Sequence, residues 1–199
     1  VTSCIGGSLT EVALCVWQFT DGAELKAAVD TCLDAVPSGD RCCSSDPKCW
    51  HPDPAMRRCG AVGCVDMPEW DVSQVADAHD LFAGRTSFLQ AITGWTFADN
   101  ANTTGMFTGA DTWLSRASRD DAIDTTTGPP SAWSLNACLE DERVEIGVCK
   151  RCTGRGLRAA GDEPALGDTP CSFPDRAALK TAVDRCLAVD SINVACCNH

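Results

Sequence analysis

Two stretches of the sequence decide the fold: residues 67–88, MPEWDVSQVADAHDLFAGRTSF, and residues 92–113, ITGWTFADNANTTGMFTGADTW. They align without a gap at an offset of 25 residues, which places Trp70 on Trp95 and Phe82 on Phe107. A period of about 20–29 residues is typical of leucine-rich-repeat-like solenoids, in which each coil buries its apolar side against its neighbours. We therefore predict a short solenoid with two clear coils, in which the repeated tryptophans lie in the core.

A second repeat places similar cysteine-rich segments at the two ends of the chain. Residues 19–43, FTDGAELKAAVDTCLDAVPSGDRCC, align without a gap with residues 173–197, FPDRAALKTAVDRCLAVDSINVACC. Upstream of them, residues 4–15 and 138–149 share their cysteine spacing. Stacks of this kind need about three repeats or capping units. We expect the two cysteine-rich units to cap the solenoid.

Each cysteine-rich unit is predicted to contain one helix. Asp21 or Asp175 can act as the N-cap, and Pro37-Ser38-Gly39 marks the end of the first helix. Apolar residues recur at helical spacing and form one stripe that includes a cysteine. The stripe consists of Leu25, Val29, Cys32 and Leu33 in the first copy and of Leu179, Val183, Cys186 and Leu187 in the second.

These patterns predict an α+β chain, in which the short solenoid lies between two homologous disulfide-stabilised helical units. The expected divisions are a first cysteine-rich unit at 1–65, solenoid coils at 66–117, a linker at 118–137, and a second cysteine-rich unit at 138–199 with an insertion at about 150–169.

The coil residues resemble the BspA-like repeat, a domain of unknown function with Trp-Asp-Val-Ser and Met-Phe-x-Gly-Ala blocks. The second coil departs from it at Thr96-Phe97-Ala98, and the block at residues 19–33 is similar to segments of secreted proteins of marine microalgae and other protists. The resemblance implies a secreted or cell-surface repeat protein used for structure, adhesion or interaction, and it supplies no catalytic residues. The matching residues are Trp70, Asp71, Val72, Ser73, Phe82, Gly84, Phe88, Trp95, Met106, Phe107, Gly109, Ala110 and Trp113.

Fifteen cysteines indicate disulfide bonds, because secreted domains use cysteines as cross-links and reduced cytosolic proteins rarely keep so many. Zinc is the alternative, since Cys149 and Cys152 have the spacing of one zinc knuckle, but a structural site needs four ligands. We predict disulfides, with one cysteine left without a partner in the chain. The residues are Cys4, Cys15, Cys32, Cys42, Cys43, Cys49, Cys59, Cys64, Cys138, Cys149, Cys152, Cys171, Cys186, Cys196 and Cys197.

Asn102-Thr103-Thr104 is an N-glycosylation sequon on a turn of the second coil, and we predict that Asn102 is glycosylated. The chain begins at Val1 without an initiator Met or a signal segment, which fits a mature product or a piece of a longer precursor. We therefore expect an extracellular protein, secreted or on the cell surface.

The composition argues against two classes of partner. A formal net charge of -12 repels phosphate backbones, so we expect no nucleic-acid binding. The longest apolar run, residues 12–17, is far shorter than the ~20 residues that span a bilayer, so we expect no membrane insertion.

Catalytic chemistry is also not expected. The three histidines, His51, His79 and His199, belong to no metal-binding or nucleophilic motif, and residues 120–124, DDAID, lack the alternating ligands of a calcium loop. We predict no catalytic residue, no cofactor and no metal site.

We therefore expect a non-enzymatic, glycosylated structural protein that associates with itself into a surface layer or fibre. Repeated units that pack head to tail between identical chains form rings or open filaments. The alternative is a monomeric secreted adhesion or ligand-binding module, for which glycans are a candidate ligand.

Overall fold

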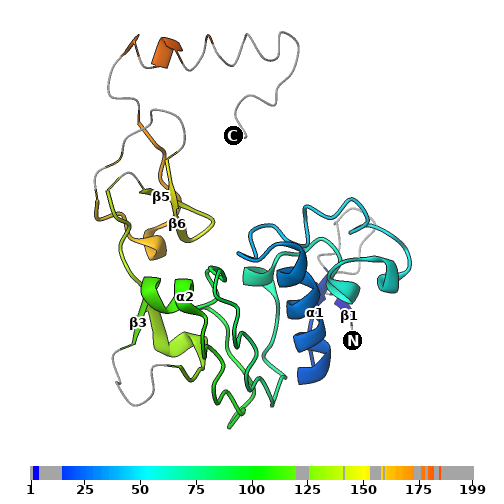
Figure 1. Cartoon of the computed structure of the whole chain (residues 1–199). Helices are drawn as coiled ribbons and strands as arrows, with labels where there is room; N and C mark the ends of the chain where they lie inside the picture. The colour runs from blue at the N-terminus through cyan, green and yellow to red at the C-terminus, as the bar shows by residue number, and fades with distance from the viewer. Residues whose placement is uncertain are drawn as a thin grey trace. The chain divides into compact units, whose positions relative to one another are not determined.

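The computed structural model describes residues 2–4, 15–119, 126–140, 142–152, 158, 160–172, 176–177, 179–181 and 184 (Figure 1). The chain divides into two compact units, Val1–Ser134 and Leu135–His199. Residues 120–124 and the cysteines Cys186, Cys196 and Cys197 lie outside the described residues, as does His199.

The described helices and strands are short, with three to six residues in all but one helix. Those of the first unit are β1 (Thr2–Cys4), β2 (Cys15–Trp17), α1 (Gly22–Ala35), η1 (Pro54–Met56), η2 (Gly60–Val62), η3 (Met67–Glu69), α2 (Asp111–Arg116), β3 (Ala117–Arg119) and η4 (Pro130–Ala132), and β4 (Trp133–Leu135) follows across the boundary. The second unit contains β5 (Glu142–Glu145), β6 (Val148–Arg151) and η5 (Pro164–Leu166). The strands pair as β1–β2, β3–β4 and β5–β6, so the described sheets are all two-stranded.

Helix α1 confirms the prediction made from the first cysteine-rich segment. The Asp21 carboxylate accepts a hydrogen bond of 2.7 Å from the backbone N–H of Ala23, which caps the first turn. The helix ends at Ala35, shortly before Gly39, which has a φ of 80°. The predicted apolar stripe is buried, with Ala28 added to it: Leu25, Ala28, Val29, Cys32 and Leu33.

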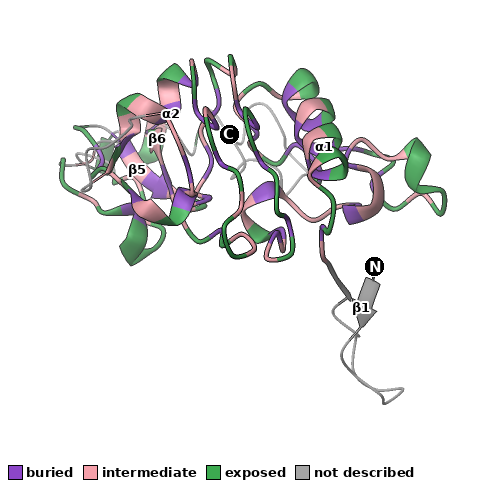
Figure 2. Cartoon of the chain, turned by 90° about the horizontal axis from the view of Figure 1, so that it is seen from below, coloured by how far each residue is buried: buried purple, intermediate pink, exposed green. Residues whose placement is uncertain are grey.

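The two predicted coils lie side by side between α1 and α2 (Figures 1 and 2). Asp77 and Asn102 form a parallel bridge, and their separation of 25 residues equals the offset of the sequence repeat. Backbone N–H groups of the first coil donate to carbonyls of the second at 2.8–3.0 Å, from Ala78 to Asn102, Asp80 to Thr104, Phe82 to Met106, and Gly84 to Thr108. The sequence repeat therefore corresponds to a repeated backbone path.

Stacked aromatic rings form the core between the coils. Trp70, Trp95 and Trp113 are buried, which confirms the prediction that the repeated tryptophans are core residues. Each indole N–H donates to a backbone carbonyl, so burial leaves no indole donor unsatisfied among these three. Successive ring centroids lie 4.0–6.1 Å apart along the series Phe19, Trp70, Trp95, Phe82, Phe107, Trp113, with Trp133 5.1 Å beyond.

Helix α1 is fastened to the first coil at both of its ends. Near its start, Gly22 approaches so closely that an added Cβ would overlap the carbonyl oxygen of Asp77. Toward its end, the Arg85 guanidinium lies 2.7 Å from Asp30 and 2.6 Å from Asp34. The backbone N–H of Leu89 donates to the carbonyl of Ser38 just after the helix. The helix therefore covers one side of the first coil.

The second unit repeats part of the first unit's construction. Among its described residues, Arg176, Ala177, Leu179, Lys180, Thr181 and Asp184 are helical, at the positions equivalent to α1. The Lys180–Asp184 ion pair at 2.7 Å matches the Lys26–Asp30 pair at 3.1 Å.

Three details distinguish the copies. Arg176 stands where the first copy has Gly22, so the second helix cannot make the same close backbone approach. Leu179 is 45% exposed, whereas its equivalent Leu25 is fully buried. The hairpins also differ, because Cys4 partners Cys15 across β1–β2 while Cys149 partners Val144 across β5–β6.

Candidate functional site

A hollow of about 520 Å³ lies between α1 and the first coil. Its apolar lining consists of Ala23, Ala27, Ala78 and Leu81, with Gly22 at the start of the helix. Its charged lining consists of Asp21, Lys26, Asp30, Asp77 and His79. A lining that combines small apolar side chains with carboxylates is suited to a partly apolar, cationic group.

The lining contains one close acid–histidine pair. His79 Nδ1 lies 2.8 Å from the Asp77 carboxylate, and the backbone N–H of His79 donates to the same oxygen. The hydrogen bond that the His79 ring donates to Asp77 raises the pKa of His79 above its ordinary value of 6.5, and the same bond lowers the pKa of Asp77. The local charge of the hollow therefore changes with the protonation of His79 near neutral pH.

Asp30, which also lines the hollow, is paired with both Lys26 and Arg85. Burial raises the pKa of Asp30, but the hydrogen bonds and charges of Arg85 and Lys26 outweigh burial and lower it overall. Asp30 is therefore ionised throughout the physiological pH range.

We predict that replacing Asp77 with Asn lowers the pKa of His79 toward 6.5, because the acceptor then carries no charge. The ion pair favours folding below pH 6.5, and its contribution is lost as the pH rises through the raised pKa of His79. Histidine ring-proton NMR across a pH titration measures the change. Asp99→Asn, at an exposed coil residue outside the hollow, is the control; an unchanged His79 pKa in Asp77→Asn would contradict the assignment.

A rigid loop carries the most exposed tryptophan of the described residues. We call residues 48–58 the Trp50 loop; its Trp50 side chain is 85% exposed and its Met56 side chain is 47% exposed. Two disulfides anchor its ends, because Cys49 near its start is bridged to Cys64 and Cys59 directly after its end is bridged to Cys43.

Hydrogen bonds also fix the backbone of the Trp50 loop. Arg57 donates from Nε to the carbonyl of His51 at 2.5 Å. Asp46 accepts from the backbone N–H groups of Lys48 and Arg58, which lowers the pKa of its carboxylate. Asp53 caps η1 through the N–H of Ala55 at 3.0 Å. The loop is thus held in one shape although its tip lies in solvent.

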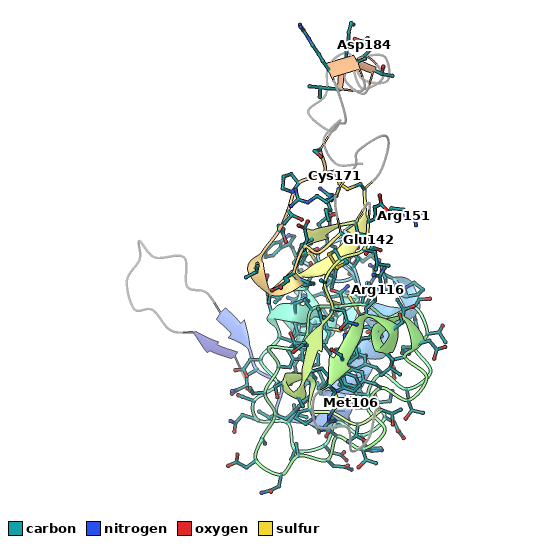
Figure 3. The ribbon with its side chains drawn as sticks, turned by 90° about the vertical axis from the view of Figure 1, so that its left-hand side faces the viewer. Met106, Arg116, Glu142, Arg151, Cys171 and Asp184 are labelled. Atoms are coloured by element: carbon teal, nitrogen blue, oxygen red, sulfur yellow. A yellow bond between two sulfur atoms is a disulfide. The ribbon has the colours of Figure 1, made fainter. Side chains whose placement is uncertain are left out.

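The cysteines confirm that the protein is disulfide-rich. Five bridges are given by the described part of the chain: Cys32–Cys42, Cys43–Cys59, Cys49–Cys64, Cys138–Cys149 and Cys152–Cys171, the last with Cys171 labelled in Figure 3. Cys149 and Cys152, considered above as a zinc knuckle, thus belong to separate bridges. Four buried sulfur atoms, those of Cys32, Cys42, Cys43 and Cys59, lie within 4.8 Å of one another because two bridges meet at adjacent residues.

Asn102 lies on the exposed surface of the second coil, next to Asp77 of the hollow. Its side-chain oxygen accepts from the backbone N–H of Thr104 at 3.2 Å. Glycosylation at this position stays a prediction. Of the three histidines, the structure places His79 in the hollow and His51 in the Trp50 loop.

The sequence analysis missed both the hollow and the Trp50 loop. The hollow arises from the packing of two segments about fifty residues apart, which no local pattern predicts. Trp50 carried a usable signal, because it lies outside the repeated tryptophan positions and next to Cys49 and two prolines.

Comparison with known families matches part of the chain. Residues 63–124 match the family described as "Mycoplasma protein of unknown function, DUF285", and this range contains both coils. The match supports a BspA-related repeat domain there. No curated protein and no solved structure matches the chain. Within the part of the chain that the structure describes, no helix has the length and apolar character of a membrane span.

Proposed function

We propose that the protein is a non-enzymatic extracellular structural protein whose chains associate into a surface layer or fibre. In this proposal, residues 66–117 form a short leucine-rich-repeat-like solenoid between two homologous disulfide-stabilised helical units. The observation that carries it is the construction of the first unit, in which stacked rings and backbone hydrogen bonds hold the coils at the register of the repeat, while disulfides tie together the segment before them. A rigid unit of this kind suits repeated packing between copies of the chain, because such packing needs surfaces of fixed shape.

The bridges and the family match support the proposed location. Disulfides form and persist in secreted and surface proteins, because cytosolic reductants keep thiols reduced. The match at residues 63–124 agrees with the resemblance to BspA-like surface repeats. The likeness of the flanking block to secreted proteins of protists and microalgae is part of the same proposal. A glycan on exposed Asn102 would be detected as excess mass on the peptide that contains it.

The repeat identifies a candidate for the odd cysteine. Cys32 and Cys42 form a bridge, and their equivalents are Cys186 and Cys196. Cys43 bridges to Cys59, but its equivalent Cys197 is followed by no further cysteine in the sequence. Together with a bridge between Cys4 and Cys15, this pairing uses every cysteine except Cys197.

We therefore predict that Cys197 of the 199-residue chain has no partner within the chain. Alkylation without reduction, followed by peptide mass spectrometry, should label Cys197 or find it bridged to a second chain. A Cys197→Ser variant should remove that label or bridge and leave the others unchanged. Labelling of Cys186 or Cys196 instead would contradict the equivalence of the two copies.

Native size decides between the proposed function and its alternative. Light scattering at micromolar concentration in oxidising buffer should show assemblies much larger than the 21.0 kDa chain, and electron microscopy should show their form. Reductant should dissolve them, because it removes the bridges that fix the first unit. A strictly monomeric protein in oxidising buffer would instead favour the secreted adhesion or ligand-binding module.

A further inference from the structure

We propose that the chains associate head to tail by inserting the Trp50 loop of one copy into the hollow beside α1 of the next. This inference rests on the proposed function, since it names the surfaces through which the protein assembles. Both surfaces belong to the first unit. Because Trp50 is 85% exposed, it does not occupy the hollow of its own chain.

The Trp50 loop has the properties of an interface anchor. Tryptophan, methionine and arginine are enriched at interface cores, and a few such residues carry most of the binding energy. Trp50 and Met56 are exposed, and Arg57 follows directly. Two disulfides and the Arg57–His51 hydrogen bond already fix the backbone, so binding orders little of the chain.

The hollow offers complementary space. Its volume of about 520 Å³ lies within the range of about 300–1,000 Å³ for sites that bury a small ligand. Its alanine and leucine lining provides apolar contact for an indole ring. Ala27 faces it from the exposed side of α1, and Leu81 closes it from the first coil.

The charges of the two surfaces also match. The Trp50 loop contains three basic residues, Lys48, Arg57 and Arg58, against one acidic residue, Asp53, in a chain of net charge -12. The side chains of Arg57 and Arg58 donate to carbonyl and hydroxyl oxygens, which do not neutralise their charge, while the Asp46 carboxylate just before the loop interacts electrostatically with Arg58 and Lys48.

Three carboxylates, Asp21, Asp30 and Asp77, line the hollow. Asp30 is paired with Lys26 and Arg85, and Asp77 is paired with His79, whereas Asp21 accepts from the backbone N–H of Ala23, a bond that does not neutralise its charge. A complementary partner offers small apolar side chains together with carboxylates, and the hollow of a second copy of this chain supplies both.

The two surfaces are different parts of one chain, so their contact is heterologous. An assembly of any length then still presents an unoccupied Trp50 loop at one end and an unoccupied hollow at the other. Heterologous contacts of this kind generate rings when the rotation closes and open filaments when it does not. One interface therefore suffices for continued assembly.

Two variants remove opposite sides of the interface. Trp50→Ala deletes the anchor, and Ala27→Arg fills the hollow with a long cationic side chain that repels the loop. Both positions are exposed, and Arg is a good helix former, so both variants should fold. Leu166→Ala, at a side chain that is 81% exposed in the second unit, is the matched control.

We expect Trp50→Ala and Ala27→Arg each to raise the concentration for half-assembly by about 30-fold or more, and Leu166→Ala to leave it unchanged. Mixing the two variants should give one-to-one dimers that do not grow, because the mixture retains one intact interface. Circular dichroism and thermal unfolding check that each variant is folded. Light scattering and native mass spectrometry measure the assemblies.

The outcomes separate the two proposals. If the unaltered chain assembles and both variants assemble equally well, the Trp50 contact is wrong and the structural function stands. The Trp50 contact is likewise wrong, and the structural function likewise stands, if the unaltered chain assembles, each variant alone is monomeric, and the mixture of the two variants forms no dimers. If the unaltered chain never assembles, the structural function itself fails, and this contact fails with it.

Discussion

Replacing Trp95 with alanine should lower the free energy of unfolding of the first unit by about 3–5 kcal/mol. Trp95 is 2% exposed, and its ring lies about 6 Å from the rings of both Trp70 and Phe82. The substitution leaves a cavity at the point where the two coils meet. It also removes the indole N–H that donates to the carbonyl of Met67 at 3.1 Å, so that carbonyl keeps the bond from the backbone N–H of Trp70 and loses a second one inside the core.

Urea unfolding followed by tryptophan fluorescence measures this loss, because all six tryptophans lie within residues 1–134 and report on the first unit alone. Trp50→Ala is the matched control, since it removes the same side chain from an 85% exposed position and should change stability by less than about 0.5 kcal/mol. Equal losses in the two variants would show that Trp95 is not a core residue.

The double substitution Cys32→Ala with Cys42→Ala should cost about 3 kcal/mol. The bridge joins residues ten apart, and the chain-entropy treatment assigns about this much to a loop of roughly ten residues. Both cysteines are fully buried, and the bridge ties the last turns of α1 to the loop that follows. Its loss should therefore also loosen the helix that covers the first coil.

The single substitution Cys32→Ala provides the comparison. It leaves the Cys42 thiol 3.7 Å from the sulfur of Cys43, which is bridged to Cys59. A thiolate there can attack the neighbouring bridge and exchange partners. Disulfide mapping should find mixed pairings among Cys42, Cys43 and Cys59 in the single variant. In the double variant it should find Cys43 paired with Cys59 only, as in the unaltered chain. A double variant as stable as the unaltered chain would contradict the stabilising role of the bridge.

The parts of the fold that could be predicted are those governed by local periodicity. The spacing of Leu25, Val29 and Leu33 specifies a helix with one buried face, and that helix lies where it was expected. The equal spacing of Trp70 and Trp95 from their phenylalanines indicated buried, repeated positions. In both cases the positions that the apolar pattern marks as buried are buried in the structure.

The remaining features depend on contacts between distant residues. The sequence repeat matches Cys4 and Cys15 to Cys138 and Cys149, yet the described hairpins differ in register. The β5–β6 turn contains Ile146 and Gly147, both at positive φ, and such a turn determines the register of a short hairpin. The hollow likewise exists only because Gly22 lets α1 approach Asp77.

The five bridges share a property that matters during synthesis. Each joins cysteines that lie only ten to nineteen residues apart. Three of them, Cys32–Cys42, Cys43–Cys59 and Cys49–Cys64, precede the coils and can close before the coils have been synthesised. Because Cys43–Cys59 and Cys49–Cys64 interleave along the sequence, native pairing of these four cysteines requires that the whole segment from Cys43 to Cys64 is available and has taken the shape of the Trp50 loop.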